Sequence, residues 1–145
     1  PLDQYRGHGE SILIVDDLES QREIATAMLT LLGYKTTAVP SGEAAVDYLQ
    51  AHAADLLLLD MIMHPGIDGL ETFKRILAFR PDQKAIIASG FSETERVGEA
   101  QRLGAGRYLR KPYSLQSLGA AVQEALHKPR RSDSLLKNEP PQKLC

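Results

Sequence analysis

The sequence holds almost no cysteine and no long hydrophobic run, and each shortage excludes a class of protein. Its single cysteine, Cys145, is the last of 145 residues and can form no internal disulfide, as is typical of proteins in a reducing compartment. No apolar run approaches the length of a membrane span, and no charged-then-apolar signal segment opens the chain. We therefore expect a cytoplasmic domain without membrane contact.

Positive charge is also scarce over most of the chain. Residues 1–126 carry 17 acidic and 12 basic side chains, whereas residues 127–145 carry two acidic and five basic ones. Affinity for DNA comes largely from the neutralisation of phosphates by Lys and Arg. We therefore expect no nucleic-acid partner.

Length and composition indicate one ordinary globular domain. The chain is 43% hydrophobic and 25% charged, and it is too short for two domains of common size. A lack of periodicity predicts a linker over residues 1–10, and a polar composition predicts a disordered tail over residues 128–145. The domain itself is expected over residues 11–127. Because the chain begins at Pro1, we interpret it as a piece cut from a longer protein or a processed one.

Short apolar runs alternate with helical patterns along the expected domain. Unbroken runs of this length are typical of strands buried on both faces of a parallel sheet. Strict alternation with right-handed crossovers predicts an α/β fold with a five-stranded parallel sheet, order 2-1-3-4-5, and helices on both faces. The expected strands are residues 12–15, 35–39, 56–60, 84–89 and 107–109, and the expected helices are residues 19–32, 42–52, 69–79, 93–103 and 115–126.

The spacing of apolar residues predicts which face of each helix meets the core. In the first helix Ile24, Met28 and either Leu31 or Leu32 recur at helical spacing, so we expect them to face the core. The fourth helix is the weakest pattern, because its apolar stripe is thin.

Carboxylates follow two of the apolar strands at their ends. Asp16 and Asp17 follow the first strand, and Asp60 ends the third, Leu56-Leu57-Leu58-Leu59-Asp60. In the predicted order these strands are neighbours, and the carboxyl ends of strands form the ligand crevice. Aspartates are also common there as turn residues and caps, but three at two strand ends favour a metal site. Oxygen ligands suit Mg²⁺, and the spacing offers no zinc shell of His or Cys.

The same crevice favours phosphoryl chemistry. A carboxylate beside a metal ion and a lysine can act as a nucleophile toward a phosphoryl group. Lys111 and Ser89 follow or end the next two strands, and a cis bond at Pro112 would aim Lys111 inward. Taken alone, Lys111 is more often a solvated surface lysine and Ser89 a strand-end hydroxyl.

As an ordered set, these residues resemble those of response-regulator receiver domains, over about residues 10–127. The resemblance implies a flavodoxin-like fold, a phosphoryl group passed to Asp60 from a histidine kinase or histidine phosphotransfer domain, and control of the face around the fourth helix and fifth strand. The run from Gly7 to Asp17 also resembles the linker before the receiver of hybrid sensor histidine kinases. The implied roles are Mg²⁺ ligation by Asp16, Asp17, Asp60 and the carbonyl of Ile62, catalysis by Asp60, Lys111 and Ser89, and switching by Ser89 and Tyr108.

Two positions in the loops affect how the site would work. Receivers resembling this one tune the path of the attacking water two residues after the phosphoacceptor and two after the switch hydroxyl, here Ile62 and Phe91. Both are apolar, which predicts slow self-dephosphorylation. The chain departs from the family where His64 is inserted before Pro65; a loop histidine is more often solvated than functional.

Two other functions would use a similar set of residues. A Mg²⁺-dependent phosphohydrolase with an Asp nucleophile would resemble Asp-x-Asp, and Asp60-Met61-Ile62 lacks the second acid. A docking module that is never phosphorylated would be expected to lose Asp60 or Lys111, and both are present. We therefore expect an acceptor domain rather than a turnover enzyme.

Overall fold

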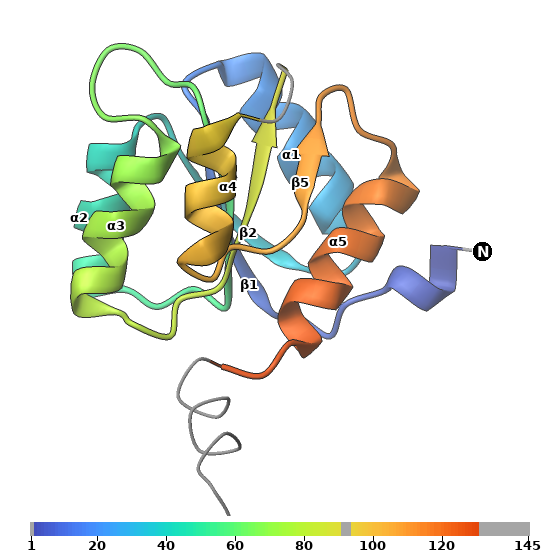
Figure 1. Cartoon of the computed structure of the whole chain (residues 1–145). Coiled ribbons are helices and arrows are strands. Elements are labelled where there is room, and N and C mark those ends of the chain that lie inside the picture. The colour runs from blue at the N-terminus through green and yellow to red at the C-terminus, as the bar shows by residue number, and fades with distance from the viewer. Residues whose placement is uncertain (1, 91–93, 131–145) are drawn as a thin grey trace, which may run out of the picture.

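A computed structural model describes residues 2–90 and 94–130 of the chain. Its strands are β1 (Ser11–Val15), β2 (Lys35–Val39), β3 (Leu56–Asp60), β4 (Ala85–Ser89) and β5 (Tyr108–Arg110). They form one sheet in the order β2-β1-β3-β4-β5, which confirms the predicted fold class and order (Figure 1). Every neighbouring pair is parallel, so all five strands end at the same edge of the sheet.

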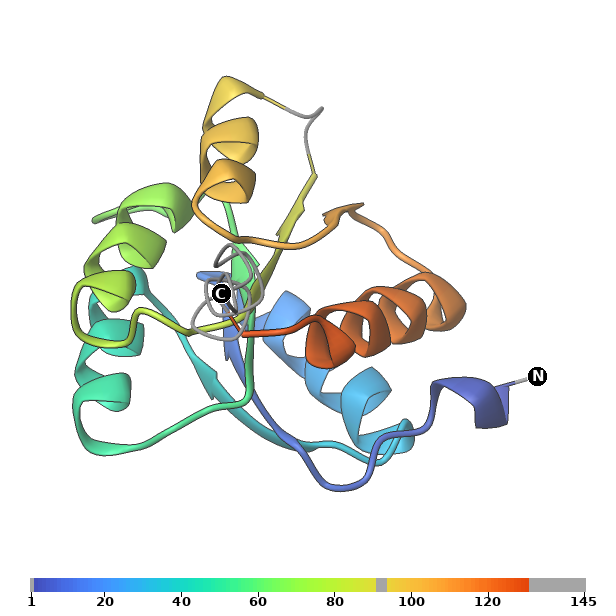
Figure 2. The same ribbon diagram turned by 60° about the horizontal axis from the view of Figure 1, so that its bottom comes forward.

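Five α-helices cover both faces of this sheet. They are α1 (Glu19–Leu31), α2 (Gly42–Ala51), α3 (Gly69–Phe79), α4 (Glu95–Arg102) and α5 (Leu115–His127). In Figure 2, α2, α3 and α4 lie on one side of the sheet, and α1 and α5 lie on the other. Each side has its own apolar core, one including Phe73 of α3 and the other Leu118 of α5.

The central strand β3 explains why the chain contains four consecutive leucines. All five of its residues are buried. Leu57 and Leu59 belong to the core under α2, α3 and α4, whereas Leu56 and Leu58 belong to the core under α1 and α5. Because neither face meets water, alternation is lost and an unbroken apolar run results. The run ends at Asp60, on the edge where all strands end.

Side-chain caps mark the predicted starts of two helices. Ser41 accepts a hydrogen bond from the Ala44 amide, and Ser114 caps α5 in the same way. Other limits differ by a residue or two, since α4 begins at Glu95 instead of residue 93 and β5 begins at Tyr108 instead of residue 107. Such differences are common at frayed ends.

The core face predicted for α1 is wrong in part. Ile24 and Leu31 are 45% and 62% exposed, whereas Ala25, Leu29 and Leu32 are buried. Successive residues are about 100° apart on a helix, so two apolar stripes lie side by side here, and spacing alone does not say which one faces the sheet. The core on this side of the sheet contains the stripe of Ala25, Leu29 and Leu32. The other stripe faces outward.

The segment before β1 packs against the domain in its described part. The segment predicted as a linker includes a 3-10 helix, η1 (Leu2–Tyr5), and lies against α5. Most of the predicted tail, residues 131–145, lies outside the described residues. Within the part that the structure describes, no helix is long and apolar enough to cross a membrane.

Candidate functional site

Three carboxylates meet where β1 and β3 end. The register pairs Val15 with Leu59, so the next residues, Asp16 and Asp60, come side by side. Oxygens of Asp16, Asp17 and Asp60 all lie within 4.8 Å of one another. Asp16 and Asp60 are buried, with 5% and 7% of their surface exposed. The clustering expected from the sequence is therefore present.

Lys111 supplies the positive charge of this cluster. Its ammonium contacts the carboxylate of Asp16 and lies 3.4 Å from Oδ1 of Asp60. The backbone N–H of Lys111 donates to the Ser89 carbonyl at 2.8 Å, which fixes the residue beside the end of β4. The bond from Lys111 to Pro112 is cis. Lys111 is thus a partly buried member of the site and not the solvated lysine that its type suggests.

Burial and the neighbouring charges together determine the pKa of Asp60. Burial is the largest influence and raises its pKa, Lys111 lowers it, and the charges of Asp16 and Asp17 raise it again; the result is a pKa of about 6. One lysine beside three carboxylates leaves the cluster with a net negative charge when all three are ionised. A divalent cation would remove the remaining repulsion.

Backbone groups hold the two other acids in place. Asp16 Oδ1 accepts a hydrogen bond from the Leu18 amide at 3.0 Å, and its carbonyl accepts one from Arg22 at 2.9 Å. Asp17 Oδ2 accepts a hydrogen bond from the His64 amide at 3.3 Å. The loop after β3 is therefore tied to the end of β1 by backbone, without use of the imidazole of His64.

Ser89 and Tyr108 lie next to the acids, on the neighbouring strands. Ser89 is the buried last residue of β4. Tyr108 pairs with Ile87, and its hydroxyl donates to the Ser89 carbonyl at 3.5 Å. The Tyr108 ring is partly buried against the core of the α4 side. Phe91 lies outside the described residues.

A cavity of about 830 Å³ opens beside the acids. Its lining combines Asp60, Lys111 and Ser89 with a group of apolar residues, here called the apolar rim: Leu18, Ile24, Met28 and Ile62. Leu18 and Ile62 on this rim are 56% and 38% exposed. The residues that line it are Asp17, Leu18, Gln21, Ile24, Met28, Asp60, Ile62, His64, Ser89, Gly90, Lys111, Pro112 and Tyr113.

The sequence predicted Ile62 at the site but not Leu18, Ile24 or Tyr113. Spacing predicts Ile24 in the core, because no pattern in the sequence distinguishes an exposed apolar stripe from a buried one. Tyr113 lines the cavity, and burial together with the charges of Asp16 and Asp60 raises its pKa to about 12. Its position two residues after Lys111 was the only available signal.

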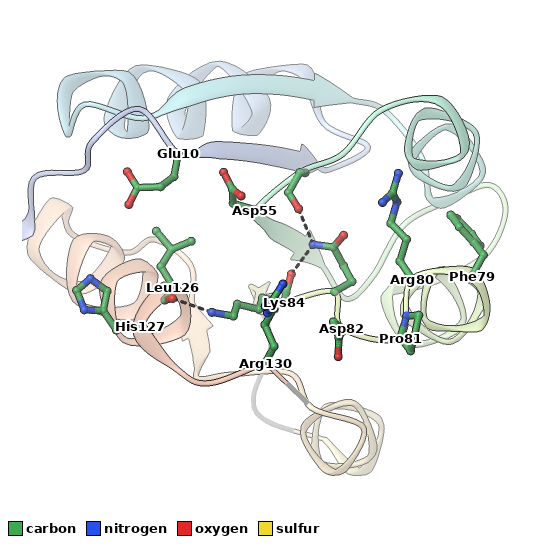
Figure 3. Close-up of a pocket in the computed structure, with 12 residues that line it drawn as sticks. Glu10, Asp55, Phe79, Arg80, Pro81, Asp82, Lys84, Leu126, His127 and Arg130 are labelled. Carbon is green, nitrogen blue, oxygen red and sulfur yellow. Dashed lines mark hydrogen bonds between the residues drawn. The ribbon is translucent and has the colours of Figure 1, made fainter. Parts of the chain in front are cut away.

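A second cavity, of about 720 Å³, lies at the opposite edge of the sheet, where the strands begin (Figure 3). Its charged side chains are used within the fold: Lys84 donates to the Leu126 carbonyl at 2.7 Å, and Asp55 accepts hydrogen bonds from Ser11. No acidic cluster of the first kind occurs there among the described residues. The chemistry therefore concentrates at the edge where the strands end, as open α/β sheets favour.

The donor set at that edge fits Mg²⁺. Hard cations prefer oxygen ligands, and the described residues bring together only carboxylates in a potential metal cluster. His64 lines the cavity but is not part of that cluster. A carbonyl and several waters would complete an octahedral shell.

Comparison with known proteins gives a consistent picture. Residues 12–123 match the model of the response regulator receiver domain. The chain is 33% identical over 117 residues to sporulation initiation phosphotransferase F of Bacillus subtilis, which covers 81% of this chain and 94% of that protein. It is 34% identical over 134 residues to the transcriptional regulatory protein ZraR of Klebsiella oxytoca, covering 92% of this chain but only 30% of that protein.

Solved structures agree with these matches. The response regulator TrrA of Thermotoga maritima, in complex with Mg²⁺ and beryllium fluoride, superimposes with a TM-score of 0.72 at 29% identity, over 80% of this chain and 98% of that one. The CheX-CheY complex of Borrelia burgdorferi, with beryllium fluoride and Mg²⁺, contains a match with a TM-score of 0.78 at 24% identity, over 88% of this chain and 100% of that one. The second similarity concerns the fold alone.

Proposed function

The chain belongs to the family of response regulator receiver domains, and from this premise we propose that Asp60 is its phosphoacceptor. Receiver domains act in two-component signalling and take phosphoryl groups from histidine kinases or phosphotransfer proteins. The observation that carries the assignment is the contact of one lysine, Lys111, with both Asp16 and Asp60 at the floor of an open cavity.

The transfer is a displacement at phosphorus. A carboxylate oxygen of Asp60 attacks the phosphoryl group of a phosphohistidine, the new O–P bond forms as the N–P bond breaks, and the electron pair returns to the imidazole. Lys111, 3.4 Å from Oδ1 of Asp60, would neutralise the charge of the phosphoryl oxygens. Ser89, at the neighbouring strand end, would donate its hydroxyl to one of them.

Asp16, Asp17, Asp60 and the Ile62 carbonyl would hold the Mg²⁺ ion. When bound, Mg²⁺ supplies charge neutralisation at the phosphoryl oxygens. The backbone contacts of Asp16 and Asp17 described above keep both carboxylates directed to one point. Pre-set ligands of this kind reduce the reorganisation that transfer requires.

The apolar rim supports a protein as the phosphodonor. Leu18 and Ile24 of the α1 side and Ile62 across the cavity expose apolar surface around the nucleophile. Exposed apolar groups gathered at one site are typical of protein contact surfaces. A helical histidine kinase or phosphotransfer domain that covers this rim would bring its phosphohistidine to Asp60 and exclude water.

We infer a switch from the Ser89 and Tyr108 pair. If the Ser89 hydroxyl moves to the phosphoryl group, the carbonyl contact of Tyr108 changes with it, and the surface around α4 and β5 changes too. A phosphoryl group can shift this equilibrium only by binding one state more tightly. NMR of the Tyr108 ring with and without beryllium fluoride tests this: an unchanged ring environment would exclude the switch role.

Replacement of the acceptor tests the main proposal. Asp60→Asn should abolish incorporation of a phosphoryl group from a small acyl phosphate, because the amide has a similar shape but is a poor nucleophile. Mass spectrometry after incubation with Mg²⁺ measures the product, and Asp47→Asn on the exposed face of α2 is the matched control. Incorporation by Asp60→Asn at the wild-type level would exclude Asp60. Turnover of a generic phosphomonoester would instead favour a phosphohydrolase.

A further inference from the structure

The N-terminal segment is attached to the domain by backbone hydrogen bonds. The amide of Gly7 donates to the Leu32 carbonyl at 2.7 Å, and the amide of Gly9 donates to the Gly33 carbonyl at 3.0 Å. On α5, the side-chain amide of Gln123 donates a hydrogen bond to the backbone carbonyl of Arg6 at 3.0 Å. Residues 2–10, here called the N-terminal strap, thus bridge the end of α1 and the surface of α5.

Two glycines make room for this contact. A Cβ atom placed on Gly119, inside α5, would lie 2.7 Å from the Cβ of Tyr5, closer than real Cβ atoms approach. A Cβ atom on Gly7 would overlap the ring of Tyr34. Glycine destabilises the interior of a helix relative to alanine, so Gly119 is unfavourable for α5 by itself. It is favourable only when Tyr5 packs against it.

We propose that the surface of α5 around Gly119 and Gln123 is a docking surface for the chain's own N-terminal strap. The strap is the occupant because it is covalently joined to β1 at Ser11 and therefore stays close to this surface. Its backbone contacts lie near Leu32, at the edge where the strands begin. In a longer protein, the polypeptide joined before the strap would leave the domain alongside α5. Residues of the strap do not line the cavity beside Asp60 among the described residues, so that cavity stays open to a phosphodonor.

This proposal does not depend on the assignment of Asp60. It is tested by whether the effect of Gly119→Ala on the melting temperature reverses when Tyr5 is removed. With the strap docked, Gly119→Ala should lower the melting temperature of the 145-residue chain, because the new methyl group displaces Tyr5. In a Tyr5→Gly background the same change should raise it by about 3 °C, because alanine favours helix.

Gly98 in α4 provides the matched control. A Cβ atom there would meet only an ordinary contact at 3.7 Å, so Gly98→Ala should raise the melting temperature in both backgrounds. Hydrogen exchange of the Gly7 and Gly9 amides is a second measurement of strap docking, and Gly119→Ala should accelerate this exchange at least about fivefold. If Gly119→Ala instead stabilises the wild-type chain as much as Gly98→Ala does, the docking surface is excluded.

The oligomeric state separates docking within one chain from exchange between two. Sedimentation equilibrium of the wild-type chain should give a monomer. A dimer that the Tyr5→Gly variant dissociates would mean that the strap docks on a second copy, which overturns the proposal. Phosphorylation by a small acyl phosphate within about twofold of wild type in Gly119→Ala would show that the strap and the acceptor site are independent.

Discussion

Asp60 is the residue at which burial and chemistry conflict most. A nucleophile must be ionised, yet burial and the two neighbouring carboxylates raise the pKa of Asp60 to about 6, against the pull of Lys111. The ordinary value for Asp in an unfolded chain is about 3.9. Between these values the folded state binds more protons than the unfolded state. This group therefore stabilises the fold below about pH 4 and loses that contribution as pH rises through 6.

The titration of Asp60 should be visible in the stability of the metal-free protein. In chelator, the urea midpoint of the wild type should fall relative to that of Asp60→Asn as pH rises from about 4 to 7, because the amide does not ionise. The difference between the two midpoints cancels the titrating groups that do not interact with Asp60. A constant difference over this range would show that the pKa of Asp60 is not raised.

The rim residue Ile62 bears on the lifetime of the phosphoryl group. Its side chain is 38% exposed at the cavity and cannot orient a water molecule by hydrogen bonding. Ile62→Asn combined with Phe91→Glu should shorten the lifetime of the acyl phosphate, measured as decay in excess Mg²⁺ after donor removal. Decay within about twofold of wild type, or ~0.4 kcal/mol in barrier, would mean that these side chains do not control the water.

At single residues, the sequence predicted the polar part of the site and, of the apolar part, only Ile62. Asp16, Asp60 and Lys111 could be found because each ends or follows a strand, and parallel strands end at one edge. Tyr113 and Leu18 could not, because apolar and aromatic side chains in loops are ordinary. Whether such a side chain lines the cavity depends on how the neighbouring helices pack, and the sequence does not give that packing.

Between elements, an ion pair joins the loop after the acceptor to α4. Asp68 caps α3 by accepting a hydrogen bond from the Glu71 amide, and its other oxygen contacts Arg96 of α4 at 2.6 Å. Burial raises the pKa of Asp68, but the hydrogen bonds from Arg96 and the backbone outweigh it and lower the pKa overall. The pair therefore contributes above the ordinary Asp pKa and is lost as pH falls.

Two substitutions at Asp68 separate its roles. Asp68→Asn keeps a good cap and removes the ion pair, so it should cost less than about 1 kcal/mol, because Arg96 is half exposed. It should also accelerate amide exchange at Val97 in α4. Asp68→Ala removes the cap as well and should cost about 1 kcal/mol more. Equal exchange in α4 for wild type and Asp68→Asn would show that the pair does not hold this helix.

The α1 helix shows why spacing alone cannot settle which face is buried. Ile24 and Met28 recur at helical spacing, and so do Ala25, Leu29 and Leu32, one position on. Hydrophobicity favours the first set, since isoleucine outranks alanine. Close approach of α1 to the sheet favours the second, and Ala25 is buried there. The outward stripe then forms part of the rim beside Asp60, so the error in the fold prediction coincides with a functional surface.

For the molecule as a whole, the hydrophobic burial that stabilises the fold also brings together three acids that repel one another. A parallel sheet brings the ends of β1 and β3 together, and burying their hydrophobic residues forces three acids into one place. Alternation of strands and helices was enough to predict this arrangement, because the crossover rule leaves few alternatives. The docking of residues 2–10 was not predictable in this way, because it depends on one tyrosine meeting one glycine across the surface of α5.

Stability of the whole chain should consequently depend on Mg²⁺. An ion at 100 times its dissociation constant would add about 2.7 kcal/mol if it binds only the folded state, or about 8 °C in melting temperature. Asp17→Asn should melt higher than wild type in chelator, because one repelling charge is gone, and should gain less from Mg²⁺ because a ligand is lost. Asp47→Asn, away from the cluster, should behave as wild type in both conditions. Equal melting of the wild type in chelator and in saturating Mg²⁺ would contradict a metal site at these carboxylates.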